Sequence, residues 1–430
     1  MTSLLRGVAA MADAPVFAIA ASGARWAVQD LRLADGIALV DSPRAASVLL
    51  VAGSLDASQA EAAWRIHDAL PHPRATVIWS SGAARPGFPE AVVIPQDADP
   101  APTIRSLYRD LVLGERPSEA ALLPDIDPAP WRGVGPYGQG GTGMTGGAPF
   151  GRPMAELGPD RDGLRLDVLP IRLGPFFPPI PTGLELDVRV AGDVIIDVAV
   201  AQPDVAHEVA TSGSPFLEAL GTPQRIAVLE MERARSHLRW VSDALRLQGL
   251  GALALRALDL AGTVGPGEVG KVSSLSAAIG RTGIYRWSLP PIDATRAAML
   301  AGAGLGPASR GLGASSDERL EDPVYRALGF EPVRRTGAGG GIADIWRTRL
   351  DEVIQSLELA ARSGGMATTV SGAVEAPRGR LSRGEAPSSR ALALVPVLLE
   401  GLEWGDAMAT MAALDIDIDE SRPASTPLPA

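Results

Sequence analysis

Cysteine is absent from the 430-residue sequence. Iron–sulfur clusters are held mainly by cysteine thiolates, and most structural zinc sites also use sulfur, so neither centre can be built in its usual form. Histidine is also scarce, and of the four histidines only His67 and His72 are close in sequence. Their spacing, beside two prolines, does not place both rings on one helix face, so we expect no metal site there.

Lysine and long apolar runs are scarce as well. Lys271 is the only lysine, and the formal net charge is −11. Nucleic-acid binding depends on clustered cations that neutralise phosphates, so we expect no nucleic-acid partner. No window reaches the roughly 18 uninterrupted apolar residues of a membrane helix, so we expect no bilayer-spanning segment. The composition, with 46% hydrophobic and 21% charged residues, is typical of a globular protein.

The first 114 residues predict an α/β domain with a parallel sheet. Continuous apolar runs typical of strands buried on both faces occur at residues 16–20, 47–52, 75–80 and 91–95. Residues 58–70 and 102–113 have the apolar spacing of helices. The order strand, helix, strand favours right-handed crossovers, which make neighbouring strands parallel.

The rest of the chain predicts a connector, a second domain and a tail. Residues 115–163 are rich in glycine and proline and predict an irregular connector. Residues 164–420 predict an α+β, helix-rich domain, with a hairpin at Gly192-Asp193 and a long helical segment over 226–260. Residues 421–430 predict a flexible tail.

A glycine-rich stretch within the connector raises the question of a cofactor site. Residues 135–153 contain Gly138, Gly140 and Gly143 at the spacing of a dinucleotide-binding turn. Such a turn needs a buried strand before it and a helix after it. The preceding WRGVGPY is not a buried strand, and the following prolines and glycines oppose a helix. We therefore favour close backbone packing over a nicotinamide nucleotide site.

Two blocks of the sequence resemble known subunits. SPRAASVLLVAG (42–53) and ALPHPRATVIWSSGA (69–83) resemble the small, cluster-bearing subunit shared by respiratory complex I, the NADH-quinone oxidoreductase, and membrane-bound nickel–iron hydrogenases. The second block resembles the large subunit of the same enzymes and comprises residues 174–195, 231–245, 370–381 and 398–420. The resemblance implies a fusion of a small-subunit-like α/β domain with a large-subunit-like α+β domain.

The sequence departs from these subunits where their metal ligands stand. At the small subunit's cysteine positions it reads AIAASGARWA (18–27), WSSGA (79–83) and IPQDADPAP (94–102). Where hydrogenases have their second metal-binding cysteine pair, it reads LDIDIDE (414–420). We therefore expect neither an iron–sulfur cluster nor a nickel–iron centre.

The resemblance also implies a quinone pocket, whose histidine is replaced here by Phe177. A phenyl ring cannot donate a hydrogen bond to a quinone carbonyl. The tyrosine of that pocket is missing from its place, because the tyrosines lie elsewhere, at Tyr108, Tyr137, Tyr285 and Tyr325. We therefore do not expect bound quinone.

Two charged clusters remain as candidate sites. Glu230, Arg233 and His237 lie at spacings of three and four in a predicted helix, where their side chains can touch. They are a candidate proton relay, although we favour a buried structural ion-pair network. The alternating acids from Asp415 resemble the start of a calcium loop, but the required glycine and final acid are missing. We predict an exposed acidic strand end there.

These observations suggest a metal-free, non-catalytic peripheral subunit of a membrane assembly, on an oxidoreductase-family scaffold. Its role would be docking or coupling on the cytoplasmic side of the inner membrane, with other subunits, including antiporter-like ones, as partners. Two alternatives remain open. One is a redox subunit that binds quinone or an organic cofactor, and the other is a soluble assembly factor.

Overall fold

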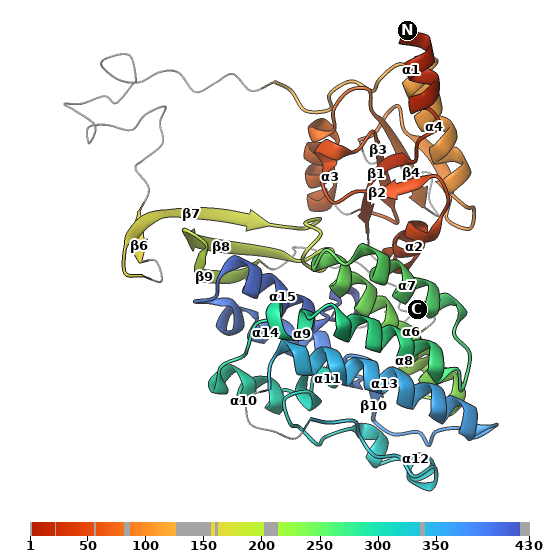
Figure 1. Cartoon of the computed structure of the whole chain (residues 1–430), viewed down its shortest axis with the longest axis vertical. Coiled ribbons are helices and arrows are strands. Elements are labelled where there is room, and N and C mark those ends of the chain that lie inside the picture. The colour runs from red at the N-terminus through yellow and green to blue at the C-terminus, as the bar shows by residue number, and fades with distance from the viewer. Residues whose placement is uncertain are drawn as a thin grey trace, which may run out of the picture.

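The chain forms an N-terminal α/β unit and a larger, helix-rich unit, drawn at the top and bottom of Figure 1. The computed structural model describes residues 2–21, 23–55, 57–80, 87–125, 156–159, 162–201, 214–335 and 340–421. The candidate glycine turn at Gly138, Gly140 and Gly143 lies outside the described residues, as does almost all of the tail. The predicted fold class, a parallel α/β unit followed by a helix-rich α+β unit, is confirmed.

The N-terminal unit is built on a parallel sheet with strand order β2-β1-β3-β4-β5. Its strands are β1 (Ala14–Ala20), β2 (Ile37–Leu39), β3 (Val48–Ala52), β4 (Ala75–Ser80) and β5 (Val92–Pro95). All residues of β3 are buried, which is typical of a strand covered on both faces. The four predicted strands are confirmed, and β2 is an additional short one.

Helices cover both faces of this sheet. α3 (Ala57–Ala69) covers one face and α4 (Ala101–Leu113) covers the other. The unit also contains α2 (Arg25–Asp30), the short 3-10 turns η1 (Leu31–Leu33) and η2 (Pro43–Ala45), and α1 (Thr2–Ala9), which packs against α4. Successive residues of a strand point to opposite faces. Accordingly, Leu50 packs with Ile104 of α4, whereas Leu49 packs with Ala63 of α3.

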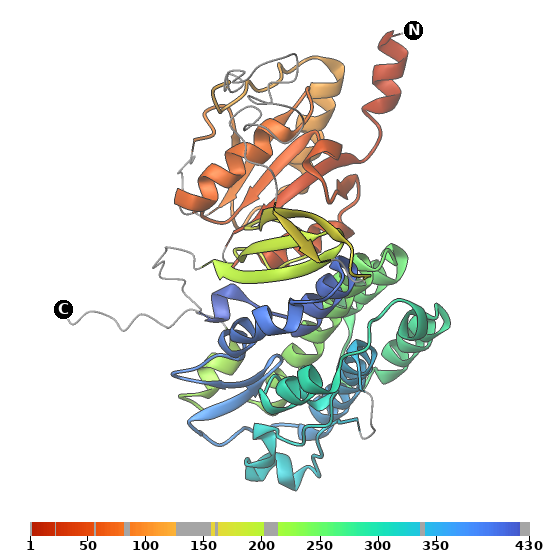
Figure 2. The ribbon, with the colours of Figure 1, turned by 90° about the vertical axis from the view of Figure 1, so that its left-hand side faces the viewer.

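An antiparallel sheet follows, with strand order β6-β7-β8-β9. It comprises β6 (Leu157–Pro159), β7 (Arg165–Leu173), β8 (Glu185–Ala191) and β9 (Val194–Ala201). The predicted hairpin is confirmed, because Gly192 has a φ of 62° between β8 and β9. Figure 2 shows this sheet between the N-terminal unit and the helices.

The helix-rich unit is centred on α6 (Ile226–Leu247) and α13 (Ile342–Ser363). The single helical segment predicted over 226–260 is in fact two helices, α6 and α7. The chain breaks at Gly249, whose φ of 74° is a left-handed conformation that glycine adopts without steric cost. The remaining helices are α5 (Pro215–Ala219), α7 (Gly251–Thr263), α8 (Val269–Arg281), α9 (Ile284–Trp287), α10 (Ala294–Gly302), α11 (Pro307–Arg310), η4 (Glu318–Leu320), α12 (Pro323–Ala327), α14 (Pro387–Leu399), α15 (Trp404–Leu414) and α16 (Ile418–Ser421).

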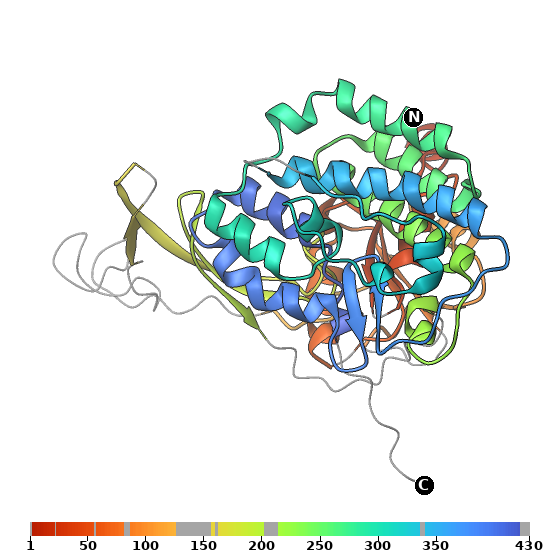
Figure 3. The same cartoon turned by 90° about the horizontal axis from the view of Figure 1, so that it is seen from below.

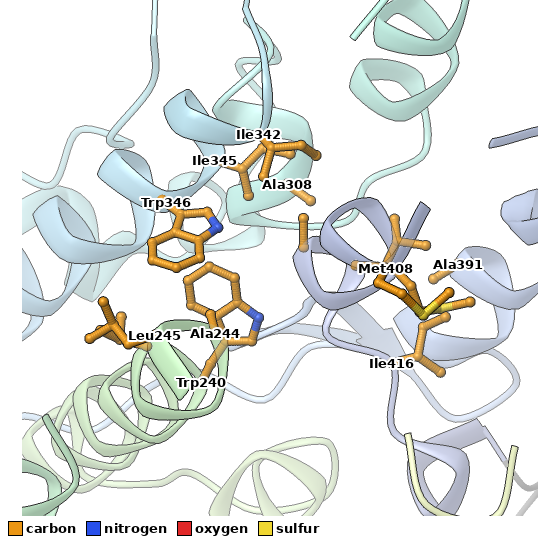
Figure 4. Close-up of a cluster of buried hydrophobic side chains, with 14 of the residues drawn as sticks. Trp240, Ala244, Leu245, Ala308, Ile342, Ile345, Trp346, Ala391, Met408 and Ile416 are labelled. Carbon is orange, nitrogen blue, oxygen red and sulfur yellow. The ribbon is translucent and has the colours of Figure 1, made fainter. Parts of the chain in front are cut away.

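The two central helices pack through aromatic side chains. Seen from below, α13 runs alongside α6 and α8 (Figure 3). Trp240 of α6 and Trp346 of α13 meet edge to face, with ring centroids 5.4 Å apart (Figure 4). A hairpin of β10 (Ala373–Ala376) and β11 (Gly379–Ser382) precedes the last helices. Within the described ranges, no helix combines the length and apolar character that a membrane crossing needs.

Candidate functional site

A network of buried ion pairs lies inside the helix-rich unit. Its carboxylates and arginines are equal in number, and apart from Arg378, whose side chain is 10% exposed, all of them are buried. We call it the ion-pair network and define it as Glu230, Asp317, Glu352, Glu375, Asp415, Arg233, Arg310, Arg319, Arg349 and Arg378. Buried charges persist only when they are paired and hydrogen-bonded, and each member of the network has an oppositely charged partner.

Arg310, at the end of α11, is the centre of the network. Its Nε donates to Oε1 of Glu352 at 2.8 Å, and its Nη1 donates to Oε1 of Glu375 at 2.6 Å. The same Nη1 lies 3.0 Å from Oδ2 of Asp317. Burial alone would lower the pKa of Arg310, but these three carboxylates raise it overall. Arg310 therefore stays charged and holds three separate segments together.

Glu230 of α6 marks one end of the network. Tyr325 and Ser356 donate hydroxyl hydrogen bonds to its two oxygens at 2.6 and 2.7 Å. Arg319 lies 3.3 Å away, and Arg233 lies 3.4 Å away. Burial would raise the pKa of Glu230, but the two guanidinium groups and the hydroxyls lower it overall. Glu230 is therefore an ionised carboxylate in the folded chain.

His237 is buried and does not contact Glu230 or Arg233 in the way the helix spacing suggests. Its Nε2 lies 3.1 Å from Oε2 of Glu352, and its Nδ1 lies 3.4 Å from Nη1 of Arg349. Burial lowers the pKa of His237 to about 4. The ring is therefore neutral near pH 7, with Nε2–H donating to Glu352 and Nδ1 accepting from Arg349.

Only part of the predicted cluster is thus in direct contact. Glu230 and Arg233 pair with each other. His237 is linked to them only indirectly, through Glu352, Arg310, Asp317 and Arg319 in turn. The sequence analysis missed these linking residues. A usable signal was present in α13, where charged Arg349 and Glu352 interrupt an otherwise apolar helix face.

Asp415 is the opposite end of the network. It follows α15 with a φ of 51° and is only 4% exposed. Arg349 donates to its Oδ2 at 3.1 Å, and Nε of Arg378 donates to its backbone carbonyl at 2.8 Å. The prediction of an exposed acidic strand end is therefore wrong for this residue. Arginines that lie far away in sequence neutralise it, and α16 follows instead of a strand.

The two segments that carry metal ligands in the resembling subunits meet at the junction of the two units. Nη1 of Arg25 lies 4.0 Å from Oδ1 of Asp415. The backbone N–H of Gly23 donates to Oδ2 of Asp419 at 2.7 Å. Residues 18–27 and 414–420 are therefore adjacent, and ion pairs and hydrogen bonds join them.

Arg239 of α6 makes the most complete ion pair at this junction. It donates two hydrogen bonds to Asp30 of α2, at 2.7 and 3.0 Å, and its guanidinium lies over the ring of Trp26, 5.4 Å from the centroid. The Arg239 side chain is 18% exposed and that of Asp30 is 51% exposed, so solvent weakens the pair.

We predict that Arg239→Ala loosens the contact of α2 without unfolding the chain. A partly exposed pair of this kind contributes about 1 kcal/mol. Hydrogen exchange should therefore become faster in α2 while the core of α13 stays protected. Arg235→Ala, an exposed arginine on the same helix, is the matched control and should leave both rates unchanged. Unchanged exchange in Arg239→Ala would show that the pair does not hold the junction.

The residues at this junction do not fit an iron–sulfur or nickel–iron centre. No thiolate is available, and the carboxylate of Asp415 is already neutralised by arginines. Among the residues that the structure describes, no group of three or more His, Cys, Asp or Glu side chains could hold a metal ion.

Phe177 lies at the edge of the same junction. It lines a pocket of about 360 Å³ between the two units and contacts Trp404, with ring centroids 6.3 Å apart. None of the described tyrosines lines this pocket, and Tyr137 lies outside the described residues. The pair of hydrogen-bonding groups that the resemblance implies for quinone is therefore not assembled by the described residues.

Comparison with known proteins finds similarity among solved structures. No protein-family model matches the sequence, and no curated protein matches it. Among solved structures, the fold is similar to a chain of the membrane-bound sulfane sulfur reductase, an archaeal respiratory membrane complex. The match has 16% sequence identity and a TM-score of 0.40, and it covers 59% of this chain and 98% of that chain.

Proposed function

We propose that this chain is a metal-free subunit of a multisubunit membrane assembly, with a docking and coupling role instead of a redox role. The observation that carries the proposal is the junction between residues 18–27 and 414–420. In the resembling subunits these segments hold metal ligands, whereas here Arg25, Asp415 and their partners form ion pairs. Ion pairs of this kind can fix the position of the two units relative to each other without transferring electrons.

The ion-pair network supports the coupling part of the proposal. Successive contacts lead from Arg25 at the junction through Asp415, Arg349, His237 and Glu352 to Arg310. Because Asp415 is shared between Arg25, Arg349 and Arg378, a shift of the N-terminal unit would change the pairing inside the helix-rich unit. We propose that the partners include antiporter-like subunits and that the chain lies on the cytoplasmic side of the inner membrane.

Affinity purification of the tagged chain from its native membranes, in mild detergent, tests this function. We expect membrane-embedded subunits to co-purify in stoichiometric amounts, and we expect elemental analysis to find iron and nickel well below one atom per chain. Arg25→Ala should retain the partners while weakening the junction, because Arg25 is one contact among several. Stoichiometric iron or nickel in the purified chain would refute the metal-free role, and recovery of the chain without any membrane protein would refute the docking role.

A further inference from the structure

The pocket at the junction is lined by both apolar and charged side chains. Its volume of about 360 Å³ is at the lower end of the range that small-molecule sites occupy. Phe176, Phe177 and Met411 are among its apolar lining residues. Arg32 and Arg246 are among its charged lining residues and come from different units, since Arg32 follows α2 and Arg246 lies in the last turn of α6.

These two arginines have few acceptors within reach. Arg32 Nη1 donates to the backbone carbonyl of Leu39 at 3.5 Å. Arg246 Nη1 donates to Asp41 Oδ1, but its Nε is buried and has no hydrogen-bond partner. Arg32 Nη2 is 3.8 Å from the same Asp41 oxygen, which is too long for a hydrogen bond. The other carboxylate near Arg32, Asp243, is paired with Arg25 at 3.3 Å. Two guanidinium groups therefore share one carboxylate.

Asp41 cannot fully neutralise both arginines, because its carboxylate lies mostly in solvent. Its side chain is 58% exposed, whereas those of Arg32 and Arg246 are 21% and 22% exposed. Burial, and then the positive charge of Arg246, lower the pKa of Arg32. Arg32 and Arg246 are therefore partly buried cations that lie close together. An oxyanion bound between them would neutralise their charge and accept hydrogen bonds from their remaining donors.

We propose that this pocket binds a small amphipathic anion, with its carboxylate or phosphate group between Arg32 and Arg246 and its apolar part against Phe177 and Met411. The site is independent of the proposed docking role, because it depends only on groups of this chain. The ligand differs in charge from a quinone, which is neutral. Asp41 occupies part of the anion position and competes with the ligand.

Calorimetric titration of the full chain tests this site, with hexyl phosphate, heptanoate and inorganic phosphate as probes. We expect hexyl phosphate or heptanoate to bind, and the tighter of the two identifies the preferred anionic group. Arg32→Gln and Arg246→Gln should each weaken that binding about tenfold or more, since each removes charge-assisted hydrogen bonds. Arg65→Gln, an exposed arginine paired with Glu61 on α3, should leave the affinity unchanged.

Two further variants separate binding from a structural role. Asp41→Asn should tighten binding of the anion, because it removes the competing carboxylate. Phe177→Ala should weaken hexyl phosphate while leaving inorganic phosphate unchanged. No binding of any probe at millimolar concentration would refute the site. Loss of affinity in Asp41→Asn together with the arginine variants would also refute it, because that pattern indicates a structural ion pair.

Discussion

Replacing Arg310 with methionine is expected to lower the free energy of unfolding by about 3–5 kcal/mol, the usual cost of breaking a buried ion pair. Arg310 is fully buried and serves Glu352, Glu375 and Asp317. Methionine fills a similar volume, so the loss comes mainly from the carboxylates that remain. They would be left with excess negative charge in a region that water does not reach.

Urea denaturation followed by circular dichroism measures this loss. Arg326→Met is the matched control, because Arg326 is an exposed arginine on α12, and it should change stability very little. Adding Glu352→Gln to Arg310→Met should recover part of the loss, since the second change removes one unneutralised carboxylate. An Arg310→Met protein as stable as the unmodified chain would show that the network does not depend on this arginine.

The elements of the N-terminal sheet were predictable because each is a local pattern. The continuous apolar runs that became β3 and β4 are long enough to identify buried strands. β2 was missed because Ile37–Leu39 is only three residues long and carries no periodicity of its own. The break between α6 and α7 was missed because one glycine, Gly249, does not by itself end a helical pattern.

The candidate site was only partly predictable because most of its contacts are not local. The pair Glu230 and Arg233 follows from helix spacing, so the sequence could indicate it. The partner of His237 is Glu352, which lies 115 residues away on α13. No periodicity within one helix can reveal a contact between two helices. The acidic run suggested that Asp415 is exposed, because the arginines that neutralise it in the interior are distant in sequence.

At the junction, arginines from two segments neutralise Asp415. A metal ion and an arginine both neutralise carboxylates, but an arginine forms directional hydrogen bonds and stays charged at all ordinary pH values. Arg349 and Arg378 hold Asp415 in this way from α13 and from the β10–β11 hairpin. The position of Asp415 is therefore fixed by segments on both sides of it, which is the property that a joint between units requires.

His237 is expected to make the folded chain less stable as the pH falls from 7 to 4. The ordinary pKa of histidine is 6.5, and burial lowers that of His237 to about 4 in the folded chain. Between these values the unfolded chain binds more protons than the folded chain, so the free energy of unfolding decreases as the pH decreases. The shift corresponds to a loss of about 3 kcal/mol at 1.36 kcal/mol per pKa unit.

His237→Gln isolates this contribution, because the glutamine amide can donate to Glu352 in place of Nε2–H and does not titrate. Denaturation at a series of pH values should show that the variant loses about 3 kcal/mol less than the unmodified chain between pH 7 and pH 4. Carboxylates also titrate in this window, but they do so in both proteins and cancel in the comparison. His72→Gln, an exposed histidine of the N-terminal unit, should keep the full pH dependence. Equal pH dependence in His237→Gln and the unmodified chain would mean that folding does not lower the pKa of His237, and the neutral ring between Glu352 and Arg349 would then be wrong.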